Sequence, residues 1–250
     1  MSVKKQCITS PRSKKTTNDS LITIVFLCDS PGYRMKSYGA IPLIPFKTKK
    51  LIDIQINAIK GVFKNFEIVL CVGYDSDRVC KYVKNKYRNI NIRIIENQIF
   101  DKSNSCESVR LCLNNINNEK VIICDGSLII DPKTFRSLNG GQSSYVMTEI
   151  DKNDDLEIGV NTGSKNFAEH FGFGAYYTWS EIIFLNNYET IEYLRKIISN
   201  DNYKQRFLFE AFNELIKTKH NIEVVQNMHP VQKINNVKTY HRLRDCLWKY

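Results

Sequence analysis

The sequence has no apolar run that approaches the roughly 18 residues needed for a membrane-spanning helix. Its first 20 residues are polar and rich in lysine, without the hydrophobic region of a secretory signal. Because both signals are missing, we expect a protein of the cytoplasm with no membrane span.

Metal and redox signatures are also missing. The eight cysteines include no C-x-x-C pair, and the four histidines are scattered without the spacing of metal ligands. Cys28, Cys71 and Cys124 fall in or beside apolar segments, where cysteine behaves as a small hydrophobe. A chain of this length does not depend on disulfides for its core, so a reducing compartment is the simpler interpretation.

The charge is unbalanced, with a formal net charge of +10 at pH 7. No stretch interleaves basic with aromatic residues as an RNA-binding strand does. Part of the excess lies in residues 1–20, which carry few large hydrophobes and predict a flexible basic leader, and the rest is spread along the chain. Either this is ordinary solvated charge, or the leader contacts an acidic macromolecular partner.

Strand-like and helix-like segments alternate through the first half of the chain. Apolar, β-branched runs bounded by polar residues predict buried parallel strands, and the amphipathic stretches between them predict helices. Strand and helix taking turns with short connections favours parallel βαβ units. The predicted strands are 22–28, 67–74, 91–97 and 121–125, and the predicted helices are 51–63, 75–87 and 103–116.

Beyond about residue 140 the order changes, because strand-like segments follow one another without helices between them. This order favours antiparallel additions in the C-terminal half. The sequence therefore predicts an α/β fold, a doubly wound and mainly parallel sheet, in a single domain over residues 21–250. The later predicted elements are strands 143–150, 156–161 and 173–179 and helices 188–199, 203–219 and 236–247.

The segment after the first predicted strand resembles a known phosphate-binding loop. In open parallel sheets, ligands bind just outside the carboxyl ends of the strands. Leu27-Cys28-Asp29-Ser30-Pro31-Gly32-Tyr33-Arg34-Met35 resembles the signature loop of the sugar-1-phosphate and phosphocholine nucleotidyltransferases. Glycine or small residues there let backbone N–H groups approach a triphosphate, and an arginine neutralises phosphate charge. The resemblance implies nucleotide binding by Leu27, Cys28, Asp29, Ser30 and Gly32 and a catalytic role for Arg34.

Further segments carry the same resemblance in matching order. Pro42-Leu43-Ile44-Pro45-Phe46, then Lys50-Leu51-Ile52-Asp53, is similar to the family segment after the loop, and Val72-Gly73-Tyr74 to one that ends a strand. The spacing of Asn97, Asn104 and Ser108 matches a pattern that opens the helix beneath the nucleotide in the phosphocholine branch. Ile123-Cys124-Asp125 and, more weakly, Ile234-Asn235-Asn236-Val237 are similar to the family's metal-binding segments. These matches imply nucleotide binding by Gly73, Asn97, Asn104 and Ser108, and metal binding by Asp125 and Asn235.

The resemblance implies a Rossmann-like nucleotide-diphospho-sugar transferase fold and a definite reaction. A nucleoside monophosphate passes from a nucleoside triphosphate to a small phosphorylated acceptor, a sugar-1-phosphate or phosphocholine, with release of pyrophosphate and with Mg²⁺ as cofactor. The attacking phosphate oxygen is already anionic, so positioning and charge neutralisation can supply the catalysis without a general base.

Three positions depart from the family pattern. Ser30 replaces a glycine, Ile41 stands where the signature lysine is expected, and Asn235 replaces a carboxylate. Lys36 is a nearby lysine that could take the catalytic role. The alternative is a degenerate, inactive relative that serves as a binding or assembly module. A glycosyltransferase of similar fold would need an Asp-x-Asp motif, which Cys124-Asp125-Gly126 does not supply.

Three other groups of residues can be interpreted. Two of them have two possible interpretations each, and the third predicts only a local turn. Asp29 and Asp125 follow neighbouring predicted strands and could form a carboxylate pair, although Asp29 could equally cap a turn. The acidic cluster of Asp151, Asp154 and Asp155 predicts a solvated hairpin turn. A group of aromatic residues forms either core or the wall of an acceptor pocket, and its members are Phe171, Phe173, Tyr176, Tyr177 and Trp179.

Overall fold

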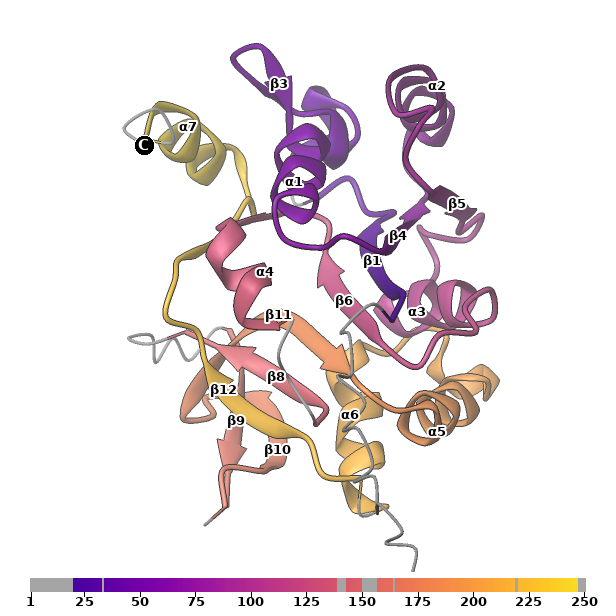
Figure 1. The fold of residues 1–250 in the computed structure, drawn as a ribbon, viewed down its shortest axis with the longest axis vertical. Helices are drawn as coiled ribbons and strands as arrows, with labels where there is room; N and C mark the ends of the chain where they lie inside the picture. The colour runs from indigo at the N-terminus through magenta and orange to yellow at the C-terminus, as the bar shows by residue number, and fades with distance from the viewer. Residues whose placement is uncertain are drawn as a thin grey trace, which may run out of the picture.

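The computed structural model describes residues 20–32, 34–138, 143–149, 157–163, 165–218 and 220–246, and Figure 1 shows their arrangement. The strands are β1 (Ile22–Cys28), β2 (Pro45–Phe46), β3 (Lys49–Lys50), β4 (Phe66–Val72), β5 (Ile92–Glu96), β6 (Val121–Asp125), β7 (Leu128–Ile130), β8 (Tyr145–Thr148), β9 (Ile158–Thr162), β10 (Ala168–Phe173), β11 (Tyr177–Leu185), β12 (Glu223–Gln226) and β13 (Val231–Lys233). The α-helices are α1 (Leu51–Lys60), α2 (Ser76–Lys86), α3 (Ser105–Leu113), α4 (Pro132–Leu138), α5 (Tyr188–Ile198), α6 (Leu208–Lys217) and α7 (Val237–Cys246). Short 3₁₀ turns are η1 (Lys36–Tyr38), η2 (Ile41–Leu43) and η3 (Asp201–Tyr203).

Within these residues, nine strands form one sheet. Its main path runs β10-β9-β11-β6-β1-β4-β5, and β8 and β12 extend it from β11. β1 pairs in parallel with β4 and β6, and β4 pairs in parallel with β5. β11 runs antiparallel to β6, β8 and β9. The predicted α/β fold, with a parallel first part and antiparallel additions, is therefore confirmed.

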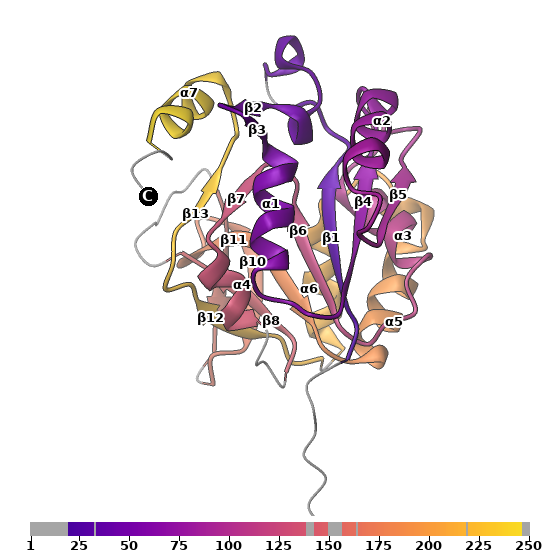
Figure 2. The same ribbon diagram turned by 45° about the horizontal axis from the view of Figure 1, so that its top comes forward.

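Helices cover both faces of the parallel strands (Figure 2). Successive side chains of a strand point to opposite faces, so Ile24 and Phe26 pack on one side of β1 and Val25 on the other. The first side is covered by α1, α2 and α4, and the second by α3, α5 and α6. Burial on both faces explains why β1 reads as a continuous apolar run rather than an alternating one.

A third, smaller cluster joins the two ends of the chain. α7 packs beside the β2–β3 hairpin and the segment that follows β1 (Figure 2). The Tyr240 hydroxyl of α7 donates a hydrogen bond to the Pro45 carbonyl at 2.7 Å, and Tyr38 of η1 lies 3.1 Å from His241 Nε2. The C-terminal helix therefore holds the segment that follows the signature-like loop.

The C-terminal half differs from the prediction in three respects. Segment 173–179 is not one strand, because Gly174 turns the chain with φ of 68° between β10 and β11. The helix predicted from residue 203 begins only at Leu208, after the 3₁₀ turn η3. The sequence also did not predict β7, β10, β12, β13 and α4, nor β2 and β3 in the first half, and most of these elements are short or pair with segments far along the chain.

Several predictions about composition can be compared with the structure. Cys28, Cys71 and Cys124 are buried in the sheet, as small hydrophobes. Over the described ranges, no helix is both long and apolar enough to cross a membrane. The acidic turn at 151–155 and all of the basic leader but Ser20 lie outside the described residues. The leader's acidic partner, the bounds of the single domain and the cytoplasmic location therefore stay predictions.

Candidate active site

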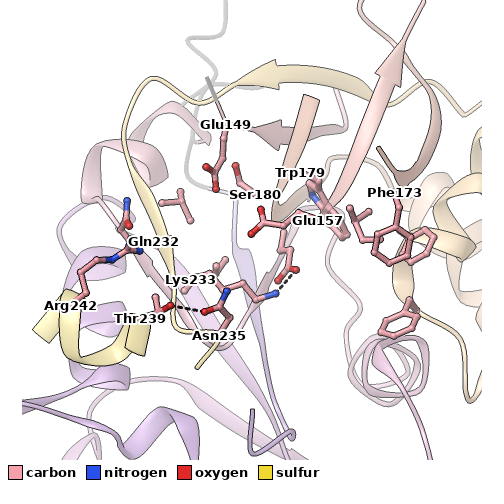
Figure 3. Close-up of a pocket in the computed structure, with 16 residues that line it drawn as sticks. Glu149, Glu157, Phe173, Trp179, Ser180, Gln232, Lys233, Asn235, Thr239 and Arg242 are labelled. Atoms are coloured by element: carbon pink, nitrogen blue, oxygen red, sulfur yellow. Dashed lines mark hydrogen bonds and ion pairs between the residues drawn. The ribbon is translucent and has the colours of Figure 1, made fainter. Parts of the chain in front are cut away.

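Three adjoining cavities lie at the carboxyl ends of β1 and β6. The loop cavity, of about 300 Å³, is lined by Leu27, Cys28, Ser30, Gly32, Ile41, Asp125, Ser127, Lys233, Ile234 and Asn235. The helix cavity, of about 340 Å³, adds the start of α3 through Phe100, Ser103, Asn104 and Ser105, and also contains Asp29, Asp125, Trp179, Glu181 and Lys233. The aromatic cavity, of about 350 Å³, is lined by Phe173, Trp179, Phe207 and Phe209 together with Glu149, Glu157, Glu181, Lys233 and Arg242 (Figure 3). Among the described residues, only Lys233 lines all three.

The loop after β1 forms one wall of this site. Gly32 has φ of 74°, and a Cβ atom there would lie 3.0 Å from Ile41 Cδ1, so the position favours glycine in both conformation and space. The Gly32 N–H donates to Ser30 Oγ at 3.2 Å. The serine that departs from the family pattern therefore folds the loop locally, and its side chain takes one backbone N–H that glycine would leave free.

Asp29 is held from below by two of the residues that the resemblance singled out. Its Oδ2 accepts hydrogen bonds from Asn97 Nδ2 at 2.9 Å and from Ser108 Oγ at 2.6 Å. Asn97 and Ser108 are buried and line none of the three cavities. Asn104 does line the helix cavity, where its side chain caps α3 by accepting from the Ser105 N–H at 2.9 Å. The structure thus gives Asn97 and Ser108 the role of fixing Asp29 from beneath.

Asp125 ends β6 beside the loop. Leu27 of β1 is its partner in the parallel register, so the first strand brings the loop next to this carboxylate. Asp125 Oδ1 accepts hydrogen bonds from the N–H and the hydroxyl of Ser127, at 2.7 and 2.5 Å. Asp125 and Asp29 both line the helix cavity. Burial and the nearby Asp125 carboxylate raise the pKa of the Cys28 thiol, so Cys28 is a neutral wall residue of the loop cavity and not a nucleophile.

An ion pair that the sequence did not suggest lies against Asp125. Lys233 Nζ lies 2.5 Å from Glu181 Oε1, and both residues line the aromatic cavity, in which Figure 3 labels Lys233. Burial and the Asp125 carboxylate raise the pKa of Glu181 to about 7, although Lys233 acts in the opposite direction. Burial acts to lower the pKa of Lys233, but the carboxylates of Asp125 and Glu181 outweigh it and raise that pKa. Lys233 is therefore a fully charged ammonium at neutral pH.

The other predicted site residues lie outside the cavities or have other partners. Arg34 and Lys36 are exposed and line none of the three cavities. Gly73 lets the end of β4 pass close to Phe100 and the Asp29 carbonyl, since a Cβ atom would lie 2.7 and 2.9 Å from them. Asn235 lines the loop and aromatic cavities, and its Oδ1 accepts from Thr239 Oγ1 at 2.7 Å.

The aromatic residues that the sequence grouped together lie in different environments. Phe171 is buried in the core, Trp179 and Phe173 line the aromatic cavity, and Tyr176 is exposed. Figure 3 shows Glu149, Glu157 and Ser180 on the same cavity wall as Trp179, with Arg242 and Gln232 across from Phe173. The buried Ser180 hydroxyl is one of several buried polar groups that have no hydrogen-bond partner within the described part of the chain. The core prediction therefore holds for Phe171, and the acceptor-pocket role of Trp179 and Phe173 stays a prediction.

A metal at this site would rely on few protein ligands. Over the described ranges, no group of three or more His, Cys, Asp or Glu side chains could hold a metal ion. The loop cavity does place two oxygen-bearing side chains, Asp125 and Asn235, along one wall. Mg²⁺ is usually held by one or two carboxylates together with substrate phosphates and water, so Asp125 fits it. The Asn235 carbonyl oxygen already accepts hydrogen bonds from Thr239 Oγ1 and Asn236 Nδ2, so it would have to give one up to hold the ion.

The fold matches that of nucleotidyltransferase structures. The CTP:phosphocholine cytidylyltransferase of Streptococcus pneumoniae is similar with a TM-score of 0.76 and 19% identity, over 91% of this chain and 99% of that one. The inositol-1-phosphate CTP transferase of T. maritima follows with a TM-score of 0.72 and 13% identity, over 90% and 96% of the two chains. A nucleoside-diphosphate-sugar pyrophosphorylase of Vibrio cholerae gives 0.68 and 11%, over 90% and 100%. No protein-family model and no curated protein matches the sequence.

Proposed function

We propose that this protein is a nucleotidyltransferase that moves a nucleoside monophosphate from a nucleoside triphosphate to the phosphate of a small acceptor and releases pyrophosphate. The observation that carries the proposal is the position of Lys233. This ammonium lies where the three cavities meet and beside Asp125, so it can contact a phosphate group that bridges nucleotide and acceptor.

The nucleoside triphosphate would occupy the loop and helix cavities. Ser30 and Gly32 line the loop cavity, where the Ser30 N–H can meet a phosphate oxygen, while Pro31 has no N–H and the Gly32 N–H is donated to Ser30 Oγ. Phe100, Asn104 and Ser105 line the helix cavity and offer one aromatic face and several polar groups to a nucleobase. Of the residues that the resemblance assigned to the nucleotide, some would contact it and others would support those residues. Asn97 and Ser108 belong to the second group, because they hydrogen-bond to Asp29.

Lys233 would do the work of the missing signature lysine. Ile41 is 3% exposed and apolar, and Lys36 lines none of the three cavities. A lysine from β13 reaches the same junction from the other end of the chain. The acceptor phosphate attacks as an anion, so the charge that Lys233 brings to the transferred phosphate is the main protein contribution, together with alignment of the two substrates.

Mg²⁺, when bound, would neutralise charge on the triphosphate. Asp125 and Asn235 are the protein groups that we propose to hold it, through one carboxylate oxygen and one amide carbonyl. Ser127 fixes the orientation of Asp125 through two hydrogen bonds to the same oxygen.

The aromatic cavity favours an acceptor with a cationic head group. Its aromatic residues Trp179, Phe173, Phe207 and Phe209 lie with Glu149 and Glu157 around one space, in a chain whose net charge is +10. Aromatic faces and carboxylates together bind quaternary ammonium groups by cation–π and ionic attraction. We therefore propose a phosphocholine-like acceptor, as in the name of the S. pneumoniae cytidylyltransferase, with its phosphate at Lys233. A sugar-1-phosphate is the competing acceptor.

The test is pyrophosphate release from each of the four common nucleoside triphosphates with phosphocholine, phosphoethanolamine and a set of sugar-1-phosphates. We expect release with phosphocholine and Mg²⁺. Lys233→Met should lower the rate by about 10²–10³-fold, the usual loss when one well-placed charge is removed. Lys120→Met is the matched control at the opposite end of β6 and should keep the wild-type rate.

Other outcomes separate the remaining readings. Release only with sugar-1-phosphates would keep the reaction and overturn the cationic acceptor. Loss of activity in Lys36→Met but not in Lys233→Met would assign the catalytic role to Lys36. No release with any pair of substrates from folded protein would favour the inactive binding module.

A further inference from the structure

Glu181 has an unusual backbone for its position. It lies inside β11 but has φ of 56°, the left-handed region that side chains other than glycine enter at a cost. The pairing of β11 with β8 shifts register between Trp179 and Ile183, so Glu181 sits in a bulge of the strand. Such a conformation persists only where the surrounding structure determines it, and it is often found at functional sites.

The register of the sheet brings Glu181 to Asp125. In the antiparallel pair β11–β6, the last paired residues are Ile182 and Cys124, so Glu181 and Asp125 come next on the two strands, and their carboxyl groups interact. Like charges directly opposite each other in a sheet are destabilising. The Lys233 ammonium enters from β13 and lies 2.5 Å from Glu181 Oε1, and it supplies the balancing charge. Three charged groups from three strands thus meet at one point.

The conformation and the charge of Glu181 both carry an energetic cost that another residue at this position would avoid. A glycine would adopt φ of 56° without cost, and an apolar residue would avoid a second carboxylate beside Asp125. Glu181 has neither advantage, and it gains the ion pair with Lys233 and a side-chain hydrogen bond with Asp125. The lysine stem has four rotatable bonds, so its ammonium would be spread over many positions without a fixed partner.

We propose that Glu181 is a positioning residue, held in a left-handed bulge of β11 so that its carboxylate fixes the Lys233 ammonium at the junction of the three cavities. The proposal rests on the proposed function for the role of Lys233 toward phosphate. Glu181 also competes with an incoming phosphate for that ammonium. It therefore lowers the affinity for the anionic nucleotide and improves the alignment of the Lys233 ammonium in the reaction.

A positioning role predicts that KM and kcat both fall when the carboxylate is removed, which a merely structural role would not predict. Glu181→Gln removes the negative charge and retains the shape, and the comparison is made above pH 7 because the pKa of Glu181 is raised to about 7. It should lower KM for the nucleoside triphosphate several-fold, because an anion beside the triphosphate is gone, and lower kcat by about 10–100-fold, because the ammonium is no longer fixed. Glu181→Asp keeps the charge and should recover part of kcat.

Glu181→Gly tests the backbone. Relief of the left-handed conformation should raise the Tm by about 2–4 °C while kcat falls as in Glu181→Gln. Asn166→Gly is the matched control, since Asn166 also has φ of 56° but lies outside the three cavities. Asparagine tolerates this region well, so the control should change Tm little and leave kcat at the wild-type value.

The possible failures are distinguishable. An active wild type with unchanged kcat in Glu181→Gln overturns the role of Glu181 and leaves the proposed function standing. A lower Tm in Glu181→Gly, with KM raised, makes Glu181 a structural residue and also overturns it. If the wild type releases no pyrophosphate, the proposed function fails, and calorimetry with inorganic tripolyphosphate decides about Glu181. Tighter binding to Glu181→Gln than to wild type then supports the hold on Lys233, and equal binding overturns it.

Discussion

At the scale of single residues, the segments that resemble the nucleotidyltransferases separate into residues that line the cavities and residues that support them. Ser30, Gly32 and Asp125 line the cavities directly. Asn97 lies underneath and fixes Asp29, and Gly73 leaves room for a neighbouring ring. A shared pattern can therefore reflect packing beneath a ligand as much as contact with it.

Gly73→Ala is expected to destabilise the protein by about 1–3 kcal/mol, the usual cost of overpacking. The new Cβ atom would lie 2.7 Å from the Phe100 side chain and 2.9 Å from the Asp29 carbonyl, so Phe100 would have to move toward the helix cavity that it lines. Denaturant unfolding measures the change. Gly61→Ala is the control, because its Cβ atom would meet only ordinary contacts at 3.5 Å. Equal stability of Gly73→Ala and wild type would contradict the steric reading.

Ile41→Lys tests whether one lysine can replace the other. Ile41 lines the loop cavity that Lys233 also lines, so a lysine there can reach the same phosphate. In the Lys233→Met background, Ile41→Lys should raise the rate of pyrophosphate release at least tenfold above that of Lys233→Met alone, since it returns one positive charge to the transferred group. In the wild type it should add little and lower stability, because position 41 is 3% exposed. A large gain in the wild type would show that Lys233 does not fill the role.

At the scale of elements, α1 and α2 are tied together by one buried carboxylate. Asp53 of α1 accepts hydrogen bonds from Lys86 Nζ and Tyr82 OH of α2, at 2.7 and 2.8 Å, and from the Lys50 N–H at the start of its own helix. Burial acts to raise the pKa of Asp53, but the hydrogen bonds from Lys86, Tyr87, Lys50 and Tyr82 outweigh it and lower that pKa. The carboxylate is therefore ionised in the folded protein and joins two helices on one face of the sheet.

Asp53→Asn should cost about 1.5–3 kcal/mol at pH 7, the range for hydrogen bonds to a charged group. The sign of the pH dependence follows from the lowered pKa. The unfolded chain binds the proton more readily, so the stabilisation is complete above pH ~4 and is lost as pH falls through the lower pKa of the folded state. The difference between variant and wild type should shrink over that acidic window in unfolding measurements. Asp101→Asn, on an exposed residue, should show no such window.

The parallel elements could be predicted from the sequence, and much of the C-terminal half could not. Strands such as β1 are buried on both faces, so each stands out as an apolar run. β13 and β7 are short, and they exist only because Val231 pairs with Ile130 across about a hundred residues. Lys233 ends β13, so its place in the site depends on that pairing. Glu181 depends on a bulge, which is a property of the assembled sheet and leaves no local signal.

At the scale of the whole molecule, the site joins the two ends of the described chain. The loop cavity combines Gly32, from just after β1, with Asn235, from just before α7. The Tyr240–Pro45 hydrogen bond and the cluster of Tyr38, Phe46 and Tyr240 hold α7 against the same segment. A ligand that contacts both segments would therefore stabilise the whole fold and not one part of it.

This linkage gives a test of the metal assignment that does not depend on turnover. Nucleoside triphosphate at about 100 times its Kd should stabilise the protein by about 2.7 kcal/mol, which corresponds to a rise in Tm of about 5–10 °C for a chain of this size. We expect part of that rise to require Mg²⁺. Asp125→Asn keeps the acceptor for the Ser127 hydrogen bonds and removes the carboxylate charge, so it should abolish the Mg²⁺-dependent part. Asp131→Asn is the control, because asparagine can accept the Lys133 N–H at the start of α4 equally well. Its thermal shift should match that of the wild type, and an equal Mg²⁺-dependent shift in Asp125→Asn would remove Asp125 from the metal site.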